Sequence, residues 1–505
     1  MKIYAYLLVL FLSLSGSVQQ LHASLFTSWT EDPSDPIYNP FPGSTLYDDY
    51  FPCVLFNANK FNGDGDAVFY KMWHQGSGVS TGNLALSTSN DGINWTLKGE
   101  TNLVAPSGLD IGHPCVLYDP NGFGGGSYHY KMWFWNGTIS SISAIQYTLS
   151  MDGFTWTTPI PVTQDLSFPL IDGVTGSYFY QLYGPGFVIY NPAATSTPGQ
   201  PYTFPYVMFF DAAGSGFVPG NAEQEAIALA YSVDGIFWTR YGSQPVLIPS
   251  GNASDWDGIY SFRPSVIKVN GVYHMFYSGS NGSSSAPYAG HGLGTGVSLG
   301  SSTPFAHGLG TASSTDGINW LKDPANPIFI NTNGVPWRSD RTYTPVVLFG
   351  TFTGTTLQGK MWFVGGDLPY TSGQAIGYAT LQNFVPTKPR HFRGKYWRSH
   401  HLKHDKNFVL KTKWRKSRSS NVAFYRVYEN GKVIKKIPKN KRLHFKKHIF
   451  TSKHLFTRYT VTAVSVDGFE STHTHLHAKR IFPHHHQHHP HKKKVPAPAS
   501  APASR

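Results

Sequence analysis

The chain has 505 residues, of which 51 are Gly, 35 are Pro and 15% are aromatic, and it shows little helical periodicity. This composition excludes a mainly helical protein and predicts an all-β fold large enough for a large domain and a small one. The formal net charge of +13 is unevenly divided, because residues 1–385 hold 12 Lys+Arg and 24 Asp+Glu whereas residues 386–505 hold 29 and 4. We therefore expect a domain boundary near Pro386 and Pro389.

Residues 1–23 are typical of a secretory signal peptide. Lys2 precedes an apolar run from Ile3 to about Leu14, and Ala23 precedes a plausible cleavage site at Ser24. The apolar run is shorter than the roughly 20 residues that cross a bilayer. We expect no transmembrane span, and a protein that is secreted or that lies at the cell surface or in a periplasm.

A seven-residue motif, Ser-x-Asp-Gly-[Ile/Phe]-x-Trp, occurs four times in the large domain. Its Asp residues stand 61, 82 and 82 positions apart and are Asp91, Asp152, Asp234 and Asp316. Repeats of this length are typical of the four-stranded blades of a β-propeller. In each copy we expect Asp-Gly to form a hairpin turn, the Ser and Asp side chains to bond its backbone, and the Trp to anchor the outer strand.

A second repeat predicts that there are five blades. Five prolines each precede an aromatic-rich strand, and they are Pro52, Pro114, Pro185, Pro264 and Pro345. The fifth unit lacks the Asp-Gly-Trp motif, but residues 28–37 match residues 319–328 at the end of the fourth blade. We expect this N-terminal strand to complete blade five and to close the ring without an exposed edge. Cys53 and Cys115 each follow one of these prolines, and either a disulfide or two buried free thiols fits the sequence.

The basic C-terminal part divides into a linker (386–399), a small domain (400–482) and a tail (483–505). Within the small domain, Trp414, Tyr425 and the run Tyr459-Thr-Val-Thr-Ala-Val464 resemble, in this order, the core strands of a fibronectin type III sandwich. The tail is rich in His and Lys and is predicted to be disordered. Its His run fits either weak binding of transition metal ions or a solvated segment with no specific function.

A sandwich with so many basic residues is expected to bind anionic polymers of a cell surface, although a generally soluble basic face also fits. The residues concerned are Lys435, Lys436, Lys439, Lys441, Arg442, Lys446 and Lys447. We expect no nucleic-acid partner, because no nucleic-acid-binding fold can be recognised in the sequence.

The innermost strands of a propeller line its channel, so residues at equal offsets from the five prolines are expected to form rings. Four positions before Pro stand Asp48, Asp110, Gln181, Tyr260 and Arg341, and one position before it stand Phe51, His113, Gly184, Arg263 and Thr344. Two carboxylates that face each other across a cleft, with a nearby cation, are what glycoside hydrolysis requires. The alternative is that these Asp residues cap turns.

With its five blades, Pro-led strands and Tyr-x-Met-Trp/Phe segments, the region of about 26–381 resembles the furanosidase-like glycoside hydrolases of the arabinanase, β-xylosidase and invertase clan. That resemblance implies catalytic carboxylates one or two positions before Pro. Here those positions are not acidic, as in Phe51-Pro52 and Tyr183-Gly184-Pro185. A sialidase is less compatible, because its Asp-box has one more residue between Asp and Gly.

Three interpretations remain. In the first, the catalytic acids have moved to Asp48, Asp49 and Asp110, with a further carboxylate from a loop, such as Asp211, Glu223, Asp257 or Asp367. In the second, the propeller binds sugar without catalysis. In the third, it is a structural or adhesive propeller. Stacking faces for sugar are offered by Trp73, His74, Trp135, Tyr183, Trp256 and Trp337.

We therefore predict an exported, monomeric, carbohydrate-active protein that hydrolyses a glycosidic bond of a bound glycan, with a non-catalytic glycan-binding or adhesive protein as the alternative. The predicted catalytic residues are Asp48, Asp49 and Asp110. The predicted substrate-binding residues are His113, Tyr183, Arg263, Arg341, Asp257 and Trp135. No cofactor and no metal is expected, because His113, His291 and His307 show no ligand spacing.

Overall fold

The structure is a computed structural model, and it divides into two compact units, residues 1–384 and 385–505, which are described separately. The described residues are 26, 28–39, 51–61, 67–75, 83–105, 109–137, 144–174, 176–214, 224–252, 254–282, 306–352, 357–366, 374–381, 385–398, 408–419, 422–449, 457–465 and 468–480. The predicted signal peptide and His/Lys-rich tail lie outside them. Secondary structure in the described part consists of strands and short 3-10 helices, and no helix there is long and apolar enough to cross a membrane.

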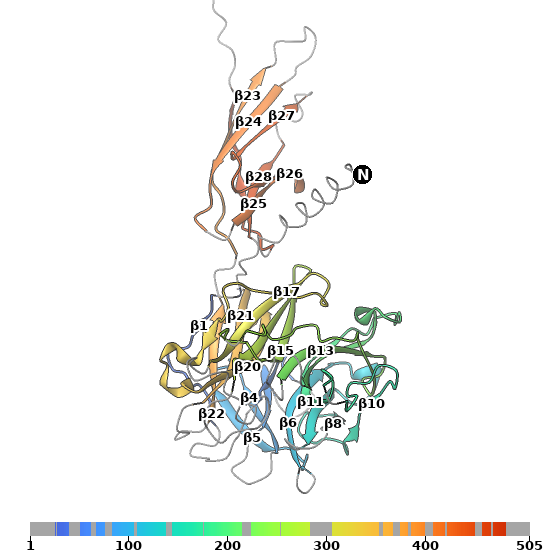
Figure 1. Cartoon of the computed structure of the whole chain (residues 1–505). Helices are drawn as coiled ribbons and strands as arrows, with labels where there is room; N and C mark the ends of the chain where they lie inside the picture. Colours follow the sequence, from blue (N-terminus) through green and yellow to red (C-terminus); the bar gives the residue numbers. More distant parts are fainter. Residues whose placement is uncertain are drawn as a thin grey trace, which may run out of the picture. The chain divides into compact units, whose positions relative to one another are not determined.

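The first unit is a β-propeller with five blades, each built on a four-stranded antiparallel meander, and a parallel pair of Glu225 with Tyr260 joins the third and fourth blades into one sheet. Many of its strands are labelled in Figure 1. Blade one contains β2 (Cys53–Phe56), β3 (Tyr70–Gln75), β4 (Leu84–Ser89) and β5 (Trp95–Glu100). Blade two contains β6 (Asp110–Tyr118), β7 (Tyr130–Gly137), β8 (Ala144–Ser150) and β9 (Ile160–Pro161). Blade three contains β11 (Gln181–Tyr190), β12 (Tyr206–Gly214), β13 (Gln224–Ser232) and β14 (Phe237–Arg240), with β10 (Thr163–Gln164) added beside β14.

Blade four contains β15 (Tyr260–Val269), β16 (Val272–Ser280), β17 (His307–Ser314) and β18 (Leu321–Lys322), with β19 (Phe329–Ile330) also paired to β17. Blade five contains β20 (Arg341–Thr351), β21 (Leu357–Gly366), β22 (Gln374–Leu381) and β1 (Thr30–Glu31). The 3-10 helices are η2 (Phe123–Gly125), η3 (Pro201–Thr203), η4 (Asn331–Asn333) and η5 (Pro336–Arg338). The innermost strands β2, β6, β11, β15 and β20 contact one another in this order, and β20 contacts β2, which closes the ring.

The N-terminal strand β1 is the outer strand of blade five. Thr30 pairs with Thr380 and Glu31 with Ala379, just as Leu321 and Lys322 pair with β17 in blade four. Tyr38 continues this attachment through a backbone bridge to Ile376, and its hydroxyl lies 2.6 Å from the Ser87 hydroxyl of blade one. The short strand β1 therefore covers the edge of β22 that would otherwise be unpaired.

The Ser-x-Asp-Gly-x-x-Trp motifs form turns with the same hydrogen bonds in all four copies. In the first, the Ser89 Oγ atom accepts hydrogen bonds from the N–H groups of Asp91 and Gly92, and the Asp91 Oδ1 atom accepts from the N–H groups of Ile93 and Asn94. Partial burial acts to raise the pKa of Asp91, but the bonds from Asn94 and the backbone outweigh it and lower the pKa to about 2. The carboxylate is thus held ionised by its own turn.

Each turn also receives a hydrogen bond from the preceding blade. The indole N–H groups of Trp73, Trp133 and Trp362 donate to the carbonyl oxygens of Gly153, Gly235 and Gly92 at 2.6, 2.7 and 2.7 Å. Blade three has Phe209 at this position, and the Tyr202 hydroxyl donates to Gly317 instead, at 2.9 Å. Blade four has Phe276, which packs against Trp29 because blade five has no such turn. Trp thus stands where its indole is the donor to the next turn, whereas Phe stands where Tyr202 is the donor or where no such turn follows.

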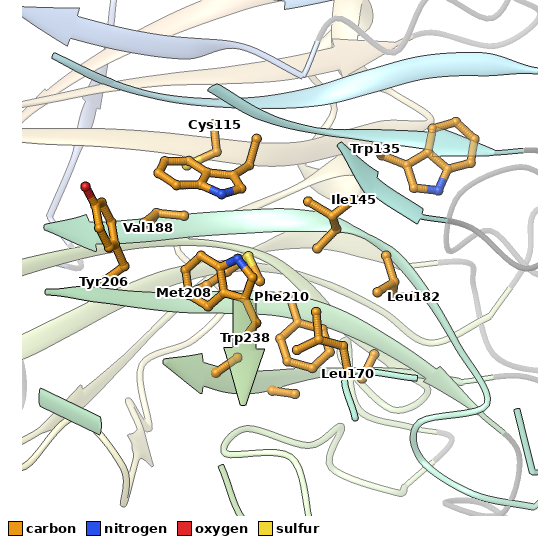
Figure 2. Close-up of a cluster of buried hydrophobic side chains, with 14 of the residues drawn as sticks. Cys115, Trp135, Ile145, Leu170, Leu182, Val188, Tyr206, Met208, Phe210 and Trp238 are labelled. Carbon is orange, nitrogen blue, oxygen red and sulfur yellow. The ribbon is translucent and has the colours of Figure 1, made fainter. Parts of the chain in front are cut away.

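The cores lie between neighbouring blades. Figure 2 shows the cluster between blades two and three, where Trp135 and Ile145 face Leu182, Met208 and Phe210. Cys53 and Cys115 are both free thiols, and the Cys53 Sγ atom accepts a hydrogen bond from the N–H group of Val116 at 3.2 Å. Of the two possibilities that the sequence left open, the structure shows two unbridged thiols.

The second unit is a β-sandwich. One sheet has the order β27 (His444–Ile449), β24 (Phe408–Arg415), β23 (Arg390–Arg398), β30 (His477–Arg480), and the other β26 (Lys432–Pro438), β25 (Val422–Glu429), β28 (Tyr459–Ser465), β29 (Thr474–His475). Trp414 packs between Phe392 and Tyr425, with ring centroids 5.6 and 6.0 Å away. The aromatic residues on which the fibronectin type III resemblance depends thus form the core of a two-sheet sandwich.

Candidate functional site

One end of the propeller is formed by the beginnings of the innermost strands. The first residue of each innermost strand pairs with a residue at the end of the second strand of its blade: Asp110 with Gly137, Gln181 with Ala213, Tyr260 with Ser280 and Arg341 with Gly366. The ring predicted four positions before each Pro thus lies at one end of the channel, which we call the mouth. Asp48 and Asp49 lie outside the described residues, as do the segments 76–82, 138–143, 215–223, 283–305 and 367–373 that continue from this end.

The residues one position before Pro share an unusual backbone conformation. All five have positive φ: Phe51 33°, His113 54°, Gly184 135°, Arg263 52° and Thr344 49°. Residues other than Gly rarely adopt this region, and the strand pairing is interrupted at the same points, for example between Phe262 and Ser265. This repeated bulge brings Phe51, His113, Arg263 and Thr344 to the wall of a channel cavity of about 130 Å³.

Four of the side chains near the axis form what we call the plug: Phe51, His113, Asp211 and Arg263. The Arg263 backbone N–H donates to the Asp211 Oδ1 atom at 2.8 Å, and its guanidinium forms an ion pair with the other carboxylate oxygen. The guanidinium Nη2 atom lies 3.2 Å from the His113 Nε2 atom, and the His113 and Phe51 rings are 3.8 Å apart. Burial raises the pKa of Asp211, an effect that Arg263 opposes. All four side chains are buried, so the plug narrows the channel below the mouth.

A second buried group at the mouth comes from blades four and five. The His307 ring is stacked between Phe262 and Tyr343, with centroids 5.8 and 5.3 Å away. The Tyr343 hydroxyl donates a hydrogen bond to the Gln374 Oε1 atom. Burial, with the nearby positive charge of Arg341, lowers the pKa of His307 to about 3. His307 is therefore neutral at physiological pH and offers an uncharged ring to its neighbours.

Sequence reasoning considered His307 only as a metal ligand and found no spacing for it. The sequence signal that could have located His307 at the mouth is its distance from the Ser-x-Asp-Gly motif that follows the third strand of the blade. His307 stands seven positions before the motif residue Ser314, and Glu225 stands seven before Ser232. Both side chains are buried at the start of a third strand, so this offset marks another ring at the mouth.

The remaining predicted site residues lie in different surroundings. Asp110 is partly exposed at the start of β6. Trp135 is buried beside His113, with ring centroids 5.7 Å apart. The Tyr183 hydroxyl accepts a hydrogen bond from the Gln181 side chain at 2.7 Å. The Arg341 Nε atom donates to the Asp340 carboxylate at 3.2 Å.

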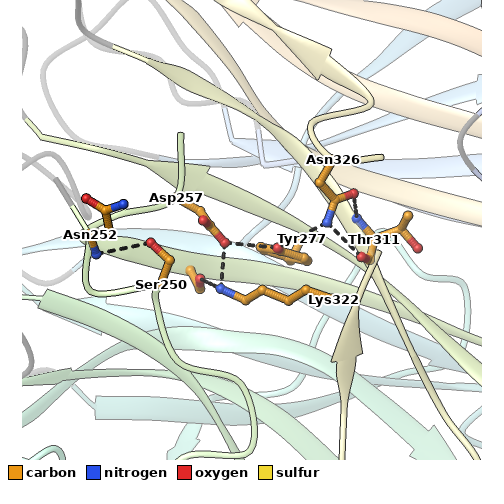
Figure 3. Close-up of polar contacts among 8 residues, drawn as sticks. Ser250, Asn252, Asp257, Tyr277, Thr311, Lys322 and Asn326 are labelled. Atoms are coloured by element: carbon orange, nitrogen blue, oxygen red, sulfur yellow. Dashed lines mark hydrogen bonds and ion pairs between the residues drawn. The ribbon is translucent and has the colours of Figure 1, made fainter. Parts of the chain in front are cut away.

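Asp257 is held within blade four rather than in the plug. Figure 3 shows its Oδ2 atom accepting hydrogen bonds from the Tyr277 hydroxyl at 3.0 Å and from the Lys322 ammonium at 2.5 Å. Lys322 belongs to the outer strand β18, so this contact ties the outer strand to the start of the blade. The structure thus brings His113, Trp135 and Arg263 together and gives Asp257 a bonding role inside the blade.

The described part of the chain contains no group of three or more His, Cys, Asp or Glu side chains that could hold a metal ion.

Comparison with protein families and with curated proteins gives no match. Among solved structures, the chain is similar to a glycosyl hydrolase from Bacteroides ovatus, with 14% identity, a TM-score of 0.43, and 70% of this chain and 93% of that one covered. An N-acetylgalactosamine deacetylase from F. plautii in complex with blood group B trisaccharide has 16% identity and a TM-score of 0.46, over 71% and 96%. A structure from the GH130 family of mannoside phosphorylases, described as containing glycoside hydrolases that target beta-1,2 mannosidic linkages in Candida mannan, has 13% identity and a TM-score of 0.43, over 70% and 93%.

Proposed function

We propose that the propeller binds a glycan at its mouth and hydrolyses a glycosidic bond there. The observation that carries this proposal is the plug. Phe51, His113, Asp211 and Arg263 are buried beneath the polar starts of the innermost strands. The cavity of about 130 Å³ extends along the residues that follow each Pro, so we place the glycan at the mouth, on the other side of the plug. A concave site with convergent polar groups at one end of a rigid ring is the usual form of a small-ligand site.

Glycoside hydrolysis requires two carboxyl groups, one as acid and one as base or nucleophile. We assign one to Asp110, a partly exposed carboxylate at the mouth. We assign the other to Asp48 or Asp49, on the sequence argument that Asp48 has the same offset from Pro52 as Asp110 has from Pro114. Arg341 and Tyr183 are proposed to bind the substrate, and the plug residues His113 and Arg263, with Trp135 beside them, to form the floor.

A non-catalytic glycan-binding propeller is the second candidate. It is favoured by the ion pairs of three acidic residues of the propeller: Asp211 with Arg263, Asp257 with Lys322 and Asp340 with Arg341. Each of these carboxylates is bound to a cation of the propeller itself.

The two candidates differ in sugar release. We would incubate the chain with chromogenic arabinosides, xylosides, fructosides, galactosides and mannosides and with natural polysaccharides. Asp110→Asn and Asp48→Asn should abolish release, whereas the control Asp119→Asn should keep it, because Asp119 lies beyond the far end of β6 and its Oδ1 atom only accepts a turn hydrogen bond from the N–H group of Asn121. Retention of the chain on one polysaccharide without release from any substrate would favour the binding protein.

Export of a monomer is also part of the proposal. Fractionation of cells that produce residues 1–505 and residues 24–505 tests export, and light scattering of the product tests the monomer. Retention of the full chain inside the cell would contradict export.

A further inference from the structure

The outer face of the sheet β30-β23-β24-β27 carries a regular array of basic side chains. The pairing register aligns them in two rows across three strands: Arg393, Lys413 and His444 in one row, and Lys395, Lys411 and Lys446 in the other. All six side chains are exposed, and we call them the cationic face. Within a row, neighbouring strands are about 4.8 Å apart, and the rows are separated by about 7 Å along the strands.

The acidic residues described in this unit are used elsewhere. Glu470 accepts hydrogen bonds from Arg426 at 2.6 Å and from the hydroxyls of Tyr428 and Thr462. Glu429 accepts from the Tyr459 hydroxyl at 2.7 Å and from the Lys447 ammonium. These contacts centre on β25 and β28 of the other sheet. These contacts of Glu470 and Glu429 are made with residues outside the cationic face.

Like charges placed directly opposite each other on paired strands are unfavourable to the sheet. The face is also hollowed, because a concavity of about 1740 Å³ is lined by residues of β23, β24 and β27 and of the segment 474–478. Apart from Thr474 of β29, the lining residues come from this sheet and from Arg442, Leu443 and Leu476 beside its strands, and all six residues of the cationic face are among them. A concave surface with two rows of cations is complementary to an extended chain of regularly spaced anions.

We infer that the cationic face binds an acidic polysaccharide, a linear glycan with carboxylate or sulfate groups, laid across the strands. The choice of a glycan rests on the proposed function, because a polymer held by the sandwich is presented to the linked propeller at a high effective concentration. This assigns the face a specific role and narrows the expected substrate to a polymer that carries negative charge.

The test measures binding of the full chain to immobilised dextran sulfate and polygalacturonate, with uncharged dextran as the blank. The triple variant Lys395→Gln/Lys411→Gln/Lys446→Gln removes one row. The matched control Lys388→Gln/Lys416→Gln/Lys432→Gln removes the same charge from exposed positions outside the cationic face. We expect the first variant to lose at least about tenfold in affinity and to show a weaker salt dependence, and the control to change by less than about twofold.

Equal losses in both triple variants would overturn the inference, because they would show a response to net charge alone. Tighter binding to duplex DNA or to phosphatidylglycerol vesicles than to either polysaccharide would also overturn it. Thermal unfolding of both variants checks that the sandwich remains folded. Release of sugar from small uncharged glycosides reports on the propeller alone. A variant that binds polysaccharide but releases no sugar would contradict the proposed function. A variant that releases sugar but no longer binds polysaccharide would support the role of the cationic face.

Discussion

Arg338 forms a bidentate ion pair with Glu31, 307 positions earlier in the chain: its Nη2 atom donates to Oε1 at 2.6 Å and its Nε atom to Oε2 at 3.2 Å. Arg338 is fully buried, and Glu31 lies on β1, the outer strand of blade five. Blade four has the same connection with the charges exchanged, because Lys322 on the outer strand β18 pairs with Asp257. The outer strand therefore carries the acidic partner of this ion pair in blade five and the basic partner in blade four.

The exchanged pair leads to a prediction about ring closure. Glu31→Lys should destabilise the propeller by about 3–5 kcal/mol, because it leaves the buried Arg338 guanidinium without its carboxylate. The double variant Glu31→Lys/Arg338→Asp copies the arrangement of blade four and should recover at least half of the loss. Denaturant unfolding measures both. A double variant as unstable as Glu31→Lys would show that the two pairs are not equivalent.

Asp35 and Asn326 occupy equivalent positions in blades five and four, and each accepts a hydrogen bond from a backbone N–H group. The Asp35 Oδ1 atom accepts from the Tyr378 N–H at 2.8 Å, and the Asn326 Oδ1 atom accepts from the Thr311 N–H at 2.9 Å. Burial raises the pKa of Asp35 from 3.8 to about 7. Because the folded-state pKa exceeds the unfolded one, the contribution of Asp35 to stability is present below about pH 4 and is lost as the pH rises to about 7.

We therefore expect Asp35→Asn to raise the unfolding temperature of the propeller by a few degrees at pH 8 and to give no gain at pH 4. Thermal unfolding of both proteins at pH 4, 6 and 8 measures the difference. The same gain at pH 4 and pH 8 would show that the effect does not come from titration of Asp35.

The blades and the completion of blade five by residues near the N-terminus could be predicted because both follow from local patterns. Asp-Gly turns, the five prolines and the match of residues 28–37 to residues 319–328 are visible in the sequence. The plug could not be predicted, because it depends on strands from different blades. Asp211 and Arg263 are 52 positions apart, and the positive φ of Arg263 follows from the bulge and not from its residue type.

The same limit applies to the predicted site. The offsets from Pro placed Asp110 and Arg341 at the same end of the channel, because register is repeated from blade to blade. From the sequence we predict Asp257 to be a loop carboxylate that binds substrate, but the structure places it against Lys322, a contact that only the folding of the outer strand creates. Asp48 and Asp49 stay predictions.

The hydrogen bond from Trp133 to the Gly235 carbonyl oxygen should contribute measurably to blade packing. Gly235 has φ +84°, and a Cβ atom there would lie 2.7 Å from the Trp133 ring, so the turn and the indole fit each other closely. Trp133→Phe should destabilise the propeller by about 1–3 kcal/mol, from the lost donor and the lost volume. Tyr202→Phe removes the corresponding donor to Gly317 with almost no change in volume and should cost about 1 kcal/mol. Denaturant unfolding measures both losses. An unchanged free energy of unfolding in Tyr202→Phe would contradict the contribution of this hydrogen bond to blade packing.

The plug allows its structural and ligand-binding roles to be separated. Arg263→Met alone should destabilise the propeller by about 3–5 kcal/mol, because Asp211 is fully buried and would keep an uncompensated charge or take up a proton. Arg263→Met/Asp211→Asn removes both charges, keeps an acceptor for the backbone N–H of residue 263, and should restore most of the stability. If the plug also forms the floor of the glycan site, this stable double variant should still lose glycan retention, because His113 loses the guanidinium that lies 3.2 Å from its Nε2 atom. Full retention of glycan by the double variant would limit the plug to a structural role and place recognition at the rim of the mouth.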